Sequence, residues 1–295
     1  MRITSFAIFN QLTRSLSSNL SSMAKLSNML ATNKKINSPS DDVSGMMKAM
    51  DYKVSINQIE QYRRNIDEVE SYLSSADTAL FSVTSALDEA KTLAVQAANT
   101  PGQNDRAKLA EKVAQLRDHI LELSNSRLRN RYIFSGYKTS TAAFDSSYTY
   151  QGDSNEINIL IDNGYSMTEN IIGSDAFSYG GVSFMKSLDN LYTALTDSDP
   201  DVAQAGAQTA IDDMSNALDQ VANTRAGIGA RLNSLDAVKY NLDDRNVTLK
   251  TFLSDVEDTD IAYTVSEISK TEVALQSLRQ SGAEILSQSL LDFLN

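Results

Sequence analysis

A regular spacing of apolar residues constrains the fold of this chain more than any other feature. Between residues 59 and 97, each step from one member of the pattern to the next is three or four positions long. A period of 3.5 residues is typical of a helix that buries a narrow stripe against a partner helix. The stripe consists of Ile59, Tyr62, Ile66, Val69, Leu73, Ala76, Leu80, Val83, Leu87, Ala90, Ala94 and Ala97. It predicts a long helix over residues 54–99.

Two further segments carry the same spacing. Pro101 and Gly102 end the first helix, and a second stripe follows over residues 109–123. A third stripe runs over residues 211–256. With only 12 Gly and 3 Pro in 295 residues, the composition also favours long, uninterrupted helices. We therefore predict a mainly α fold, a long antiparallel helical coiled-coil rod built from both halves of the chain.

Three polar residues, Arg225, Lys239 and Asn246, interrupt the third stripe. Polar groups in a helical seam can set the register and the oligomeric state. They can equally face solvent where one helix extends past its partner. The sequence leaves both interpretations open.

The character of the sequence changes over residues 132–181. Aromatic and β-branched residues alternate there with turn signals such as "QGDSNE" and "DNG", a pattern that favours short antiparallel strands over helix. We expect a small β-rich insert domain at the tip of the rod. Its aromatic residues could form a ligand surface, but we prefer the interpretation that they form the core of the insert.

Both ends of the chain carry thin apolar stripes flanked by Ser, Asn and Gln. Such sparse stripes offer little apolar surface to offset the entropy of ordering the chain. We therefore expect terminal helical arms, residues 1–40 and 256–295, that become ordered on assembly. The predicted assembly interface consists of Phe9, Leu12, Leu16, Leu20, Met23, Leu26, Leu30, Ile261, Val265, Ile268, Leu275, Leu278, Ile285, Leu290 and Phe293.

The stretch "NKKINSPSDDVSGM", residues 33–46, carries two adjacent aspartates behind a proline. A catalytic pair would need partners that the sequence does not offer. We interpret the stretch as a helix start, with Ser38 as the N-cap and Pro39 as the first helical residue. Asp41 then completes a capping box, and Asp41 and Asp42 face the positive end of the helix dipole. The motif joins the N-terminal arm to the rod.

The residue types exclude most catalytic and metal chemistry. The chain has no Cys, which removes thiolate ligands and nucleophiles, and its single histidine, His119, has no partner constellation. The acidic residues within 255–260 lack the glycine-containing loop of a calcium site, so we interpret them as a solvated helix boundary. We predict no enzymatic activity, no cofactor and no metal.

Charge and hydropathy limit the possible partners. The net charge of −12 disfavours nucleic-acid binding. The first 40 residues carry five basic and no acidic side chains, whereas residues 255–295 carry eight acidic and two basic ones. No apolar run is long enough to span a membrane, and the N-terminus lacks the pattern of a cleaved signal peptide.

The terminal segments resemble those of bacterial flagellins and the related junction proteins of the flagellar axis. "KKINSPSDDVSGM" is similar to an N-terminal motif of that family, and "TRAGIGARLNSLD" together with residues 254–295 is similar to its C-terminal region. The short insert, opening with "RYIFSGYKTSTAAF", and the "SLLDFLN" ending resemble the junction proteins more than flagellin itself.

The resemblance implies a structural, self-assembling subunit between the flagellar hook and filament. Its implied partners are further copies of itself, flagellin, a junction protein on the hook side, the flagellar export apparatus and an export chaperone. It implies an extracellular location reached without a cleaved signal peptide. The expected layers are the arms in the inner core, a helical rod of residues 41–131 and 182–255, and the insert outside. The alternatives are a short minor flagellin and, in another class, a cytoplasmic coiled-coil signalling or scaffold adaptor.

Overall fold

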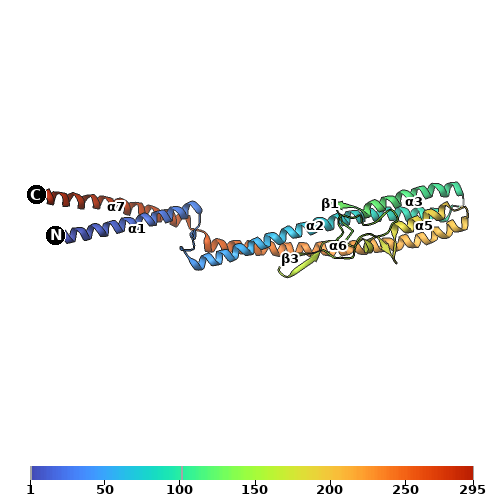
Figure 1. Ribbon diagram of the computed structural model, residues 1–295, viewed down its shortest axis with the longest axis horizontal. Helices are drawn as coiled ribbons and strands as arrows, with labels where there is room; N and C mark the ends of the chain where they lie inside the picture. Colours follow the sequence, from blue (N-terminus) through green and yellow to red (C-terminus); the bar gives the residue numbers. More distant parts are fainter. Residues whose placement is uncertain (1, 101, 295) are drawn as a thin grey trace. The chain divides into compact units, whose positions relative to one another are not determined.

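The structure is a computed structural model that describes the backbone of residues 2–100 and 102–294, and the side chains of residues 6–100 and 102–284 (Figure 1). Helices dominate it. They are α1 (Arg2–Thr32), α2 (Val43–Ala98), α3 (Gln103–Ser124), α4 (Gly173–Ala176), α5 (Phe184–Thr196), α6 (Pro200–Glu257) and α7 (Ile261–Leu294).

Short antiparallel strand pairs lie between α3 and α5. They are β1 (Arg127–Leu128) with β2 (Arg131–Tyr132), β3 (Asn158–Asp162) with β4 (Tyr165–Thr168), and β5 (Ser178–Tyr179) with β6 (Val182–Ser183). We call residues 127–183, from β1 to β6, the insert. The mainly helical fold with a small strand-containing insert is the one that the sequence predicts.

The chain divides into two compact units. We call Met1–Gln58 with Asp244–Asn295 the terminal unit, and Ile59–Asp243 the central unit. Helices α2 and α6 each contribute one part to the terminal unit and one part to the central unit.

The predicted stripe on α2 forms the core of the central unit. All of its members are buried except Tyr62, which is half-buried. Helix α6 contributes a buried residue at every seventh position, the spacing of one position in a heptad repeat. These residues are Met214, Val221, Ile228, Leu235 and Leu242. The periodicity therefore predicts both the helices and the faces that they bury.

Two of the polar residues that interrupt the α6 stripe form ion pairs with α2. Arg225 donates from Nε to Asp77 over 2.8 Å, and the Lys239 ammonium lies 2.9 Å from Asp67 and 3.3 Å from Glu70. Each pair is partly exposed and contributes at most about 1 kcal/mol. Because the pairs form only in one alignment, they set the register of α6 on α2 within the chain.

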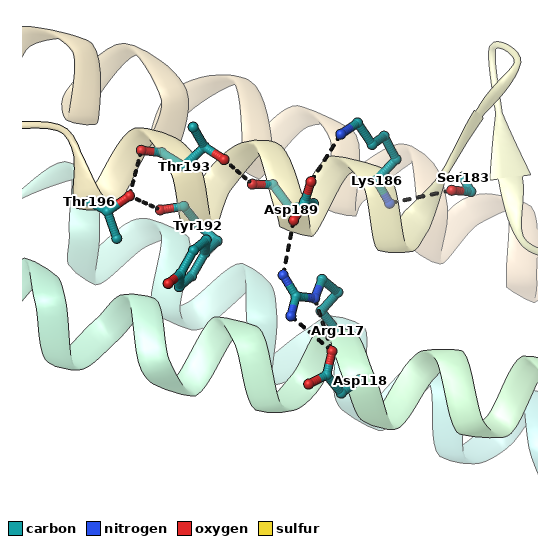
Figure 2. A network of polar contacts seen from close by, with 8 residues as sticks. All are labelled: Arg117, Asp118, Ser183, Lys186, Asp189, Tyr192, Thr193 and Thr196. Carbon is teal, nitrogen blue, oxygen red and sulfur yellow. Dashed lines mark hydrogen bonds and ion pairs between the residues drawn. The ribbon is translucent and has the colours of Figure 1, made fainter. Parts of the chain in front are cut away.

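Helices α3 and α5 lie side by side in the central unit (Figure 1). Figure 2 shows Arg117 of α3 reaching Asp189 of α5, with 2.9 Å between the paired atoms. Lys186 pairs with the same carboxylate over 2.9 Å. The Ser183 hydroxyl accepts a hydrogen bond from the Lys186 amide, which makes Ser183 the N-cap of α5.

The phenylalanines of the insert form its core, as the sequence predicts, whereas Tyr137, Tyr165 and Tyr179 are exposed. The Phe177 ring meets the Phe134 ring edge-on, with 4.8 Å between centroids. It also lies 5.8 Å from Phe144 and 6.4 Å from Phe184. All four side chains are buried.

The insert packs along the side of α2, which differs from the expected position at the tip. The Asn65 amide donates to the Leu160 carbonyl over 2.7 Å, and the Tyr72 hydroxyl donates to the Ile133 carbonyl over 3.0 Å. Both donors lie far before the end of α2 at Ala98. Figure 1 shows these strands along the length of the paired helices, set back from the end at which the chain passes from α2 to α3.

Candidate assembly interface

The terminal unit exposes apolar side chains on every one of its helical segments. Among the residues whose side chains the structure describes, the buried apolar ones in this unit are Ile36, Ala49, Ile56 and Leu275. The large exposed ones are Phe6, Ile8, Phe9, Leu20, Val43, Met47, Met50, Val54, Val247, Phe252, Ile261, Tyr263, Val265 and Val273. Exposed apolar surface on this scale marks an interaction site.

Helices α1 and α7 pack against each other (Figure 1). Gly282 of α7 lies so close to α1 that a Cβ there would come 2.8 Å from Leu12 Cδ2. Leu275 is buried in this pair. Seven other residues of the predicted interface are half-buried: Leu12, Leu16, Met23, Leu26, Leu30, Ile268 and Leu278. Much of the predicted stripe is therefore used within one chain.

The remaining predicted residues fall into two groups. Phe9, Leu20, Ile261 and Val265 are exposed and available to a partner. Ile285, Leu290 and Phe293 lie outside the residues whose side chains the structure describes. The assembly role of the full set stays a prediction.

The first turns of α2 carry an exposed apolar stripe that the sequence reasoning missed. Val43, Met47, Met50 and Val54 are spaced by four, three and four residues and are 64%, 64%, 59% and 55% exposed. This spacing places them on one face of the helix, which we call the α2 stripe. The sequence signal that indicates this stripe is the same alternation of three and four positions.

A compact joint connects α1, α2, α6 and α7 within the terminal unit. Helix α1 ends at Thr32, and the next residue, Asn33, has a φ of 57°, which suits the residue after a helix. The Asn33 carbonyl accepts from the Thr259 amide over 3.1 Å, and the Lys35 amide donates to the Glu257 carbonyl over 2.8 Å. Ile36 is buried beside Gly45, where a Cβ would come 2.5 Å from Ile36 Cδ1.

The Glu257 carboxylate is the electrostatic centre of this joint. It is 5% exposed and lies 2.8 Å from the Lys34 ammonium and 2.7 Å from that of Lys53. Burial raises its pKa, but the hydrogen bonds from Lys34 and Lys53 outweigh burial, and the net shift is downward. The prediction that the acidic residues within 255–260 form a solvated helix boundary is therefore wrong for Glu257. Asp260 does mark a helix start, because it accepts from the Tyr263 amide over 3.0 Å.

Helix α2 begins at Val43, four residues later than predicted. Its N-cap is Asp42, whose side chain accepts from the Gly45 amide over 2.9 Å. Ser38 and Pro39 belong to a preceding turn that the Asp41 amide closes on the Ser38 carbonyl. The prediction of Ser38 as the N-cap and Pro39 as the first helical residue is therefore wrong.

Asp41 supports that turn rather than the helix. Its carboxylate accepts from the backbone amides of Asn37 and Ser38 and pairs with Lys25 over 3.0 Å. The hydrogen bond with Lys25 and those from the two amides hold its pKa well below the usual range. Asp41 thus ties α1 to the start of α2. Of the two hydrogen bonds of the predicted capping box, the one from the Ser38 amide to the Asp41 side chain is present, whereas the Asp41 amide donates to the Ser38 carbonyl instead of the Ser38 hydroxyl.

Removing the correct cap should loosen the start of α2. We expect Asp42→Ala to cost about 1 kcal/mol locally and Ser38→Ala to cost less than about 0.5 kcal/mol. Amide exchange over residues 46–50 should therefore rise about fivefold in the first variant and remain nearly unchanged in the second. The reverse order would restore Ser38 as the cap.

The described residues show neither a group of metal ligands nor a membrane-spanning helix. Within them, no three His, Cys, Asp or Glu residues come together as a metal site. His119 is exposed on α3. Over the same residues, no helix combines the length and apolar character needed to cross a membrane.

Comparison with known proteins accounts for most of the chain. The bacterial flagellin N-terminal helical region matches residues 3–139, and the bacterial flagellin C-terminal helical region matches residues 211–294. The chain belongs to the bacterial flagellin family. The two matched regions contain α2, α3 and α7, nearly all of α1 and residues 211–257 of α6. They therefore cover almost the whole terminal unit. The cytoplasmic adaptor loses its support, because its case rested on coiled-coil periodicity and net negative charge, and neither feature accounts for the two family matches.

Relatives of this flagellin-family chain span nearly its whole length. Flagellar hook-associated protein 3 of Escherichia coli strain K12 is 28% identical, with 98% of each chain covered. Flagellin of Bacillus subtilis strain 168 is also 28% identical, covering 98% of this chain and 96% of its own. A Vibrio parahaemolyticus structure, of a protein assigned as a flagellar hook-associated protein, matches with a TM-score of 0.70. It is 25% identical and covers 74% of this chain and 100% of its own.

Proposed function

We propose that this chain is a structural subunit of the bacterial flagellar axis that forms the junction between hook and filament. It polymerises through its terminal helices and offers a platform for flagellin. The observation that carries the proposal is the end-to-end match to hook-associated protein 3, which covers 98% of both chains.

The surface of the terminal unit supports polymerisation. A helix that is apolar on more than one face requires cover on more than one side. The terminal unit exposes apolar residues from α1, α2, α6 and α7. A single globular partner covers one side, whereas a ring of identical copies can cover several sides at once. This is the reason to propose further copies of the chain as its main partner.

The other partners follow from the proposed place in the flagellum. Flagellin would bind on one side of the ring and a hook-associated junction protein on the other. The chain would reach the cell exterior through the flagellar export apparatus, with an export chaperone and without a cleaved signal peptide. The absence of Cys suits passage as an unfolded chain, because no disulfide can form on the way.

Deletion of the gene tests the junction role directly. We expect cells that carry hooks without filaments and that release flagellin into the medium, because flagellin has no platform on which to assemble. Electron microscopy of the cells and immunoblots of the medium measure both effects. Re-expression of the intact chain should restore filaments.

The match to Bacillus subtilis flagellin supports a second candidate, a short minor flagellin. Loss of a minor flagellin would leave filaments in place, so the same deletion separates the two candidates. Immunolabelling gives an independent distinction. A junction subunit is confined to the base of the filament, whereas a flagellin is distributed along it.

A further inference from the structure

Glu169 is a buried residue with one carboxyl oxygen that lacks a hydrogen-bond partner in the described structure. The residue is 1% exposed, and its Oε1 atom has no donor among the residues that the structure describes. Burying an ionised, unpaired carboxylate costs several kcal/mol, so such a group is driven toward its neutral form. No part of the proposed assembly interface uses Glu169, which lies in the central unit.

Glu169 borders a small cavity between the insert and α2. The cavity has a volume of about 20 Å³, enough for one water molecule. Its other lining residues are Glu68, Ser71 and Tyr72 of α2, and Leu128, Arg129 and Arg131 of the β1–β2 hairpin.

The charged and titratable neighbours do not neutralise an ionised Glu169. The Tyr72 hydroxyl already donates to the carbonyls of Tyr132 and Ile133. Neither Arg129 nor Arg131 lies within ion-pair distance of Glu169 in the described structure. Burial raises the pKa of Glu169, the Arg131 charge lowers it, Glu68 raises it further, and the net shift is upward.

The backbone on both sides of Glu169 is fixed to α6. Arg231 of α6 donates to the carbonyls of Thr168 and Asn170 over 3.4 Å and 3.3 Å. The Glu169 amide itself donates to the Ile157 carbonyl over 2.8 Å. The Arg231 guanidinium is thus occupied by these carbonyls, while the Glu169 side chain borders the cavity toward α2.

We propose that Glu169 is a proton-dependent switch that controls the packing of the insert on α2. In the protonated state the neutral carboxyl is tolerated in the cavity, and the insert stays docked. On ionisation the carboxylate either draws water into the cavity or moves out of the cavity. Either change loosens the β1–β2 hairpin from α2. Helices α2 and α6 remain paired through their own buried stripes.

The direction of the pH dependence follows from the raised pKa. The docked state keeps the proton at pH values where an exposed glutamate has lost it. The docking stability is therefore full below the exposed pKa of about 4.3 and falls as the pH rises through the pKa of the docked state. The inference concerns the insert alone and does not depend on the junction role.

Amide exchange of the full-length chain, measured by mass spectrometry at about pH 5 and about pH 8 and corrected for intrinsic rates, tests the switch. We expect the protection of residues 127–135 to fall at least about tenfold at the higher pH, while residues 60–95 stay unchanged. Glu169→Gln should abolish the fall, because the amide is neutral at both pH values. Glu122→Gln, at an exposed position on α3, is the matched control and should retain it.

A second variant keeps the test decisive if Glu169→Gln does not fold. Glu68→Gln removes the like charge beside the cavity and should move the midpoint of the transition to lower pH. Protection that does not change with pH in the wild type would overturn the proposal. So would a pH-dependent loss of protection that persists in Glu169→Gln, or a midpoint that Glu68→Gln leaves in place.

Discussion

Replacing Met47 and Met50 together by aspartate should abolish filament formation and leave the monomer folded. Both side chains belong to the α2 stripe and are 64% and 59% exposed, so the monomer does not bury them. In the proposed ring they would be buried against a neighbouring copy, and burial of one methionine contributes about 1.5–3 kcal/mol. The variant loses both contributions and also forces two carboxylates into an apolar contact. A loss of several kcal/mol per contact lowers the association constant more than about 1000-fold.

Complementation of the deletion strain measures this effect. Cells that express the double variant should carry hooks without filaments, whereas circular dichroism of the purified monomer should match the wild type. A matched control replaces Val95 and Val202 by aspartate, because both are exposed apolar residues of the central unit. Normal filaments in the Met47 and Met50 variant would remove the α2 stripe from the interface. Loss of filaments in both variants would point to a general effect of added charge.

The sequence predicts the helices of this chain well because its core is periodic. The stripe from Ile59 to Ala97 specifies the helix and its buried face together, since a period of 3.5 residues is specific to paired helices. The insert is less predictable. Its aromatic residues identify a core, but the place where Asn65 and Tyr72 bind it depends on contacts far apart in sequence. The sequence pattern therefore predicts that strands form in the insert, whereas the place where the insert packs on α2 depends on tertiary contacts.

The helix start shows why local signals can mislead. The stretch "SPSDDVSG" contains two candidate caps with the same spacing, Ser38 before Asp41 and Asp42 before Gly45. Local chemistry does not separate them. The choice depends on distant partners, because Asp41 pairs with Lys25. Buried Ile36 also lies against Gly45.

Buried charges depend even more on the fold. Nothing in the sequence around Glu257 or Glu169 indicates burial of the carboxylate, since each is directly followed by a polar residue, Asp258 and Asn170. Glu257 can be buried as a charged group because Lys34, from the segment between α1 and α2, and Lys53 of α2 both meet it. Glu169 becomes buried without such partners, and sequence reasoning has no means of finding this kind of site. Such a site can be found only when the structure shows which hydrogen-bond donors lie too far from the carboxylate to pair with it.

Amide exchange in the purified monomer should show that the α1 and α7 pair is far less stable than the core of α2. Over residues 6–32 and 261–284, the buried side chains are those of Thr264 and Leu275. The apolar seam of α2 in the central unit is buried at each of its positions from Ile66 to Ala94. Segments with few buried apolar contacts open locally with free energies near zero, whereas core helices open only with global unfolding, at about 5–15 kcal/mol. We therefore expect the amides of residues 6–32 and 261–284 to exchange at least about 1000-fold faster than those of residues 66–94.

Assembly should remove this difference, because polymerisation would bury the exposed faces of α1 and α7 against neighbouring copies. Exchange in isolated hook–filament junctions provides that comparison, with residues 66–94 as the internal reference in both samples. The Met47→Asp and Met50→Asp variant provides a matched control, since it should keep the monomer pattern under assembly conditions. Equal protection of the terminal pair and the α2 core in the monomer would show that the terminal helices are stable alone. The sparse apolar stripes of the two chain ends would then need a different explanation, because ordering on assembly would no longer account for them.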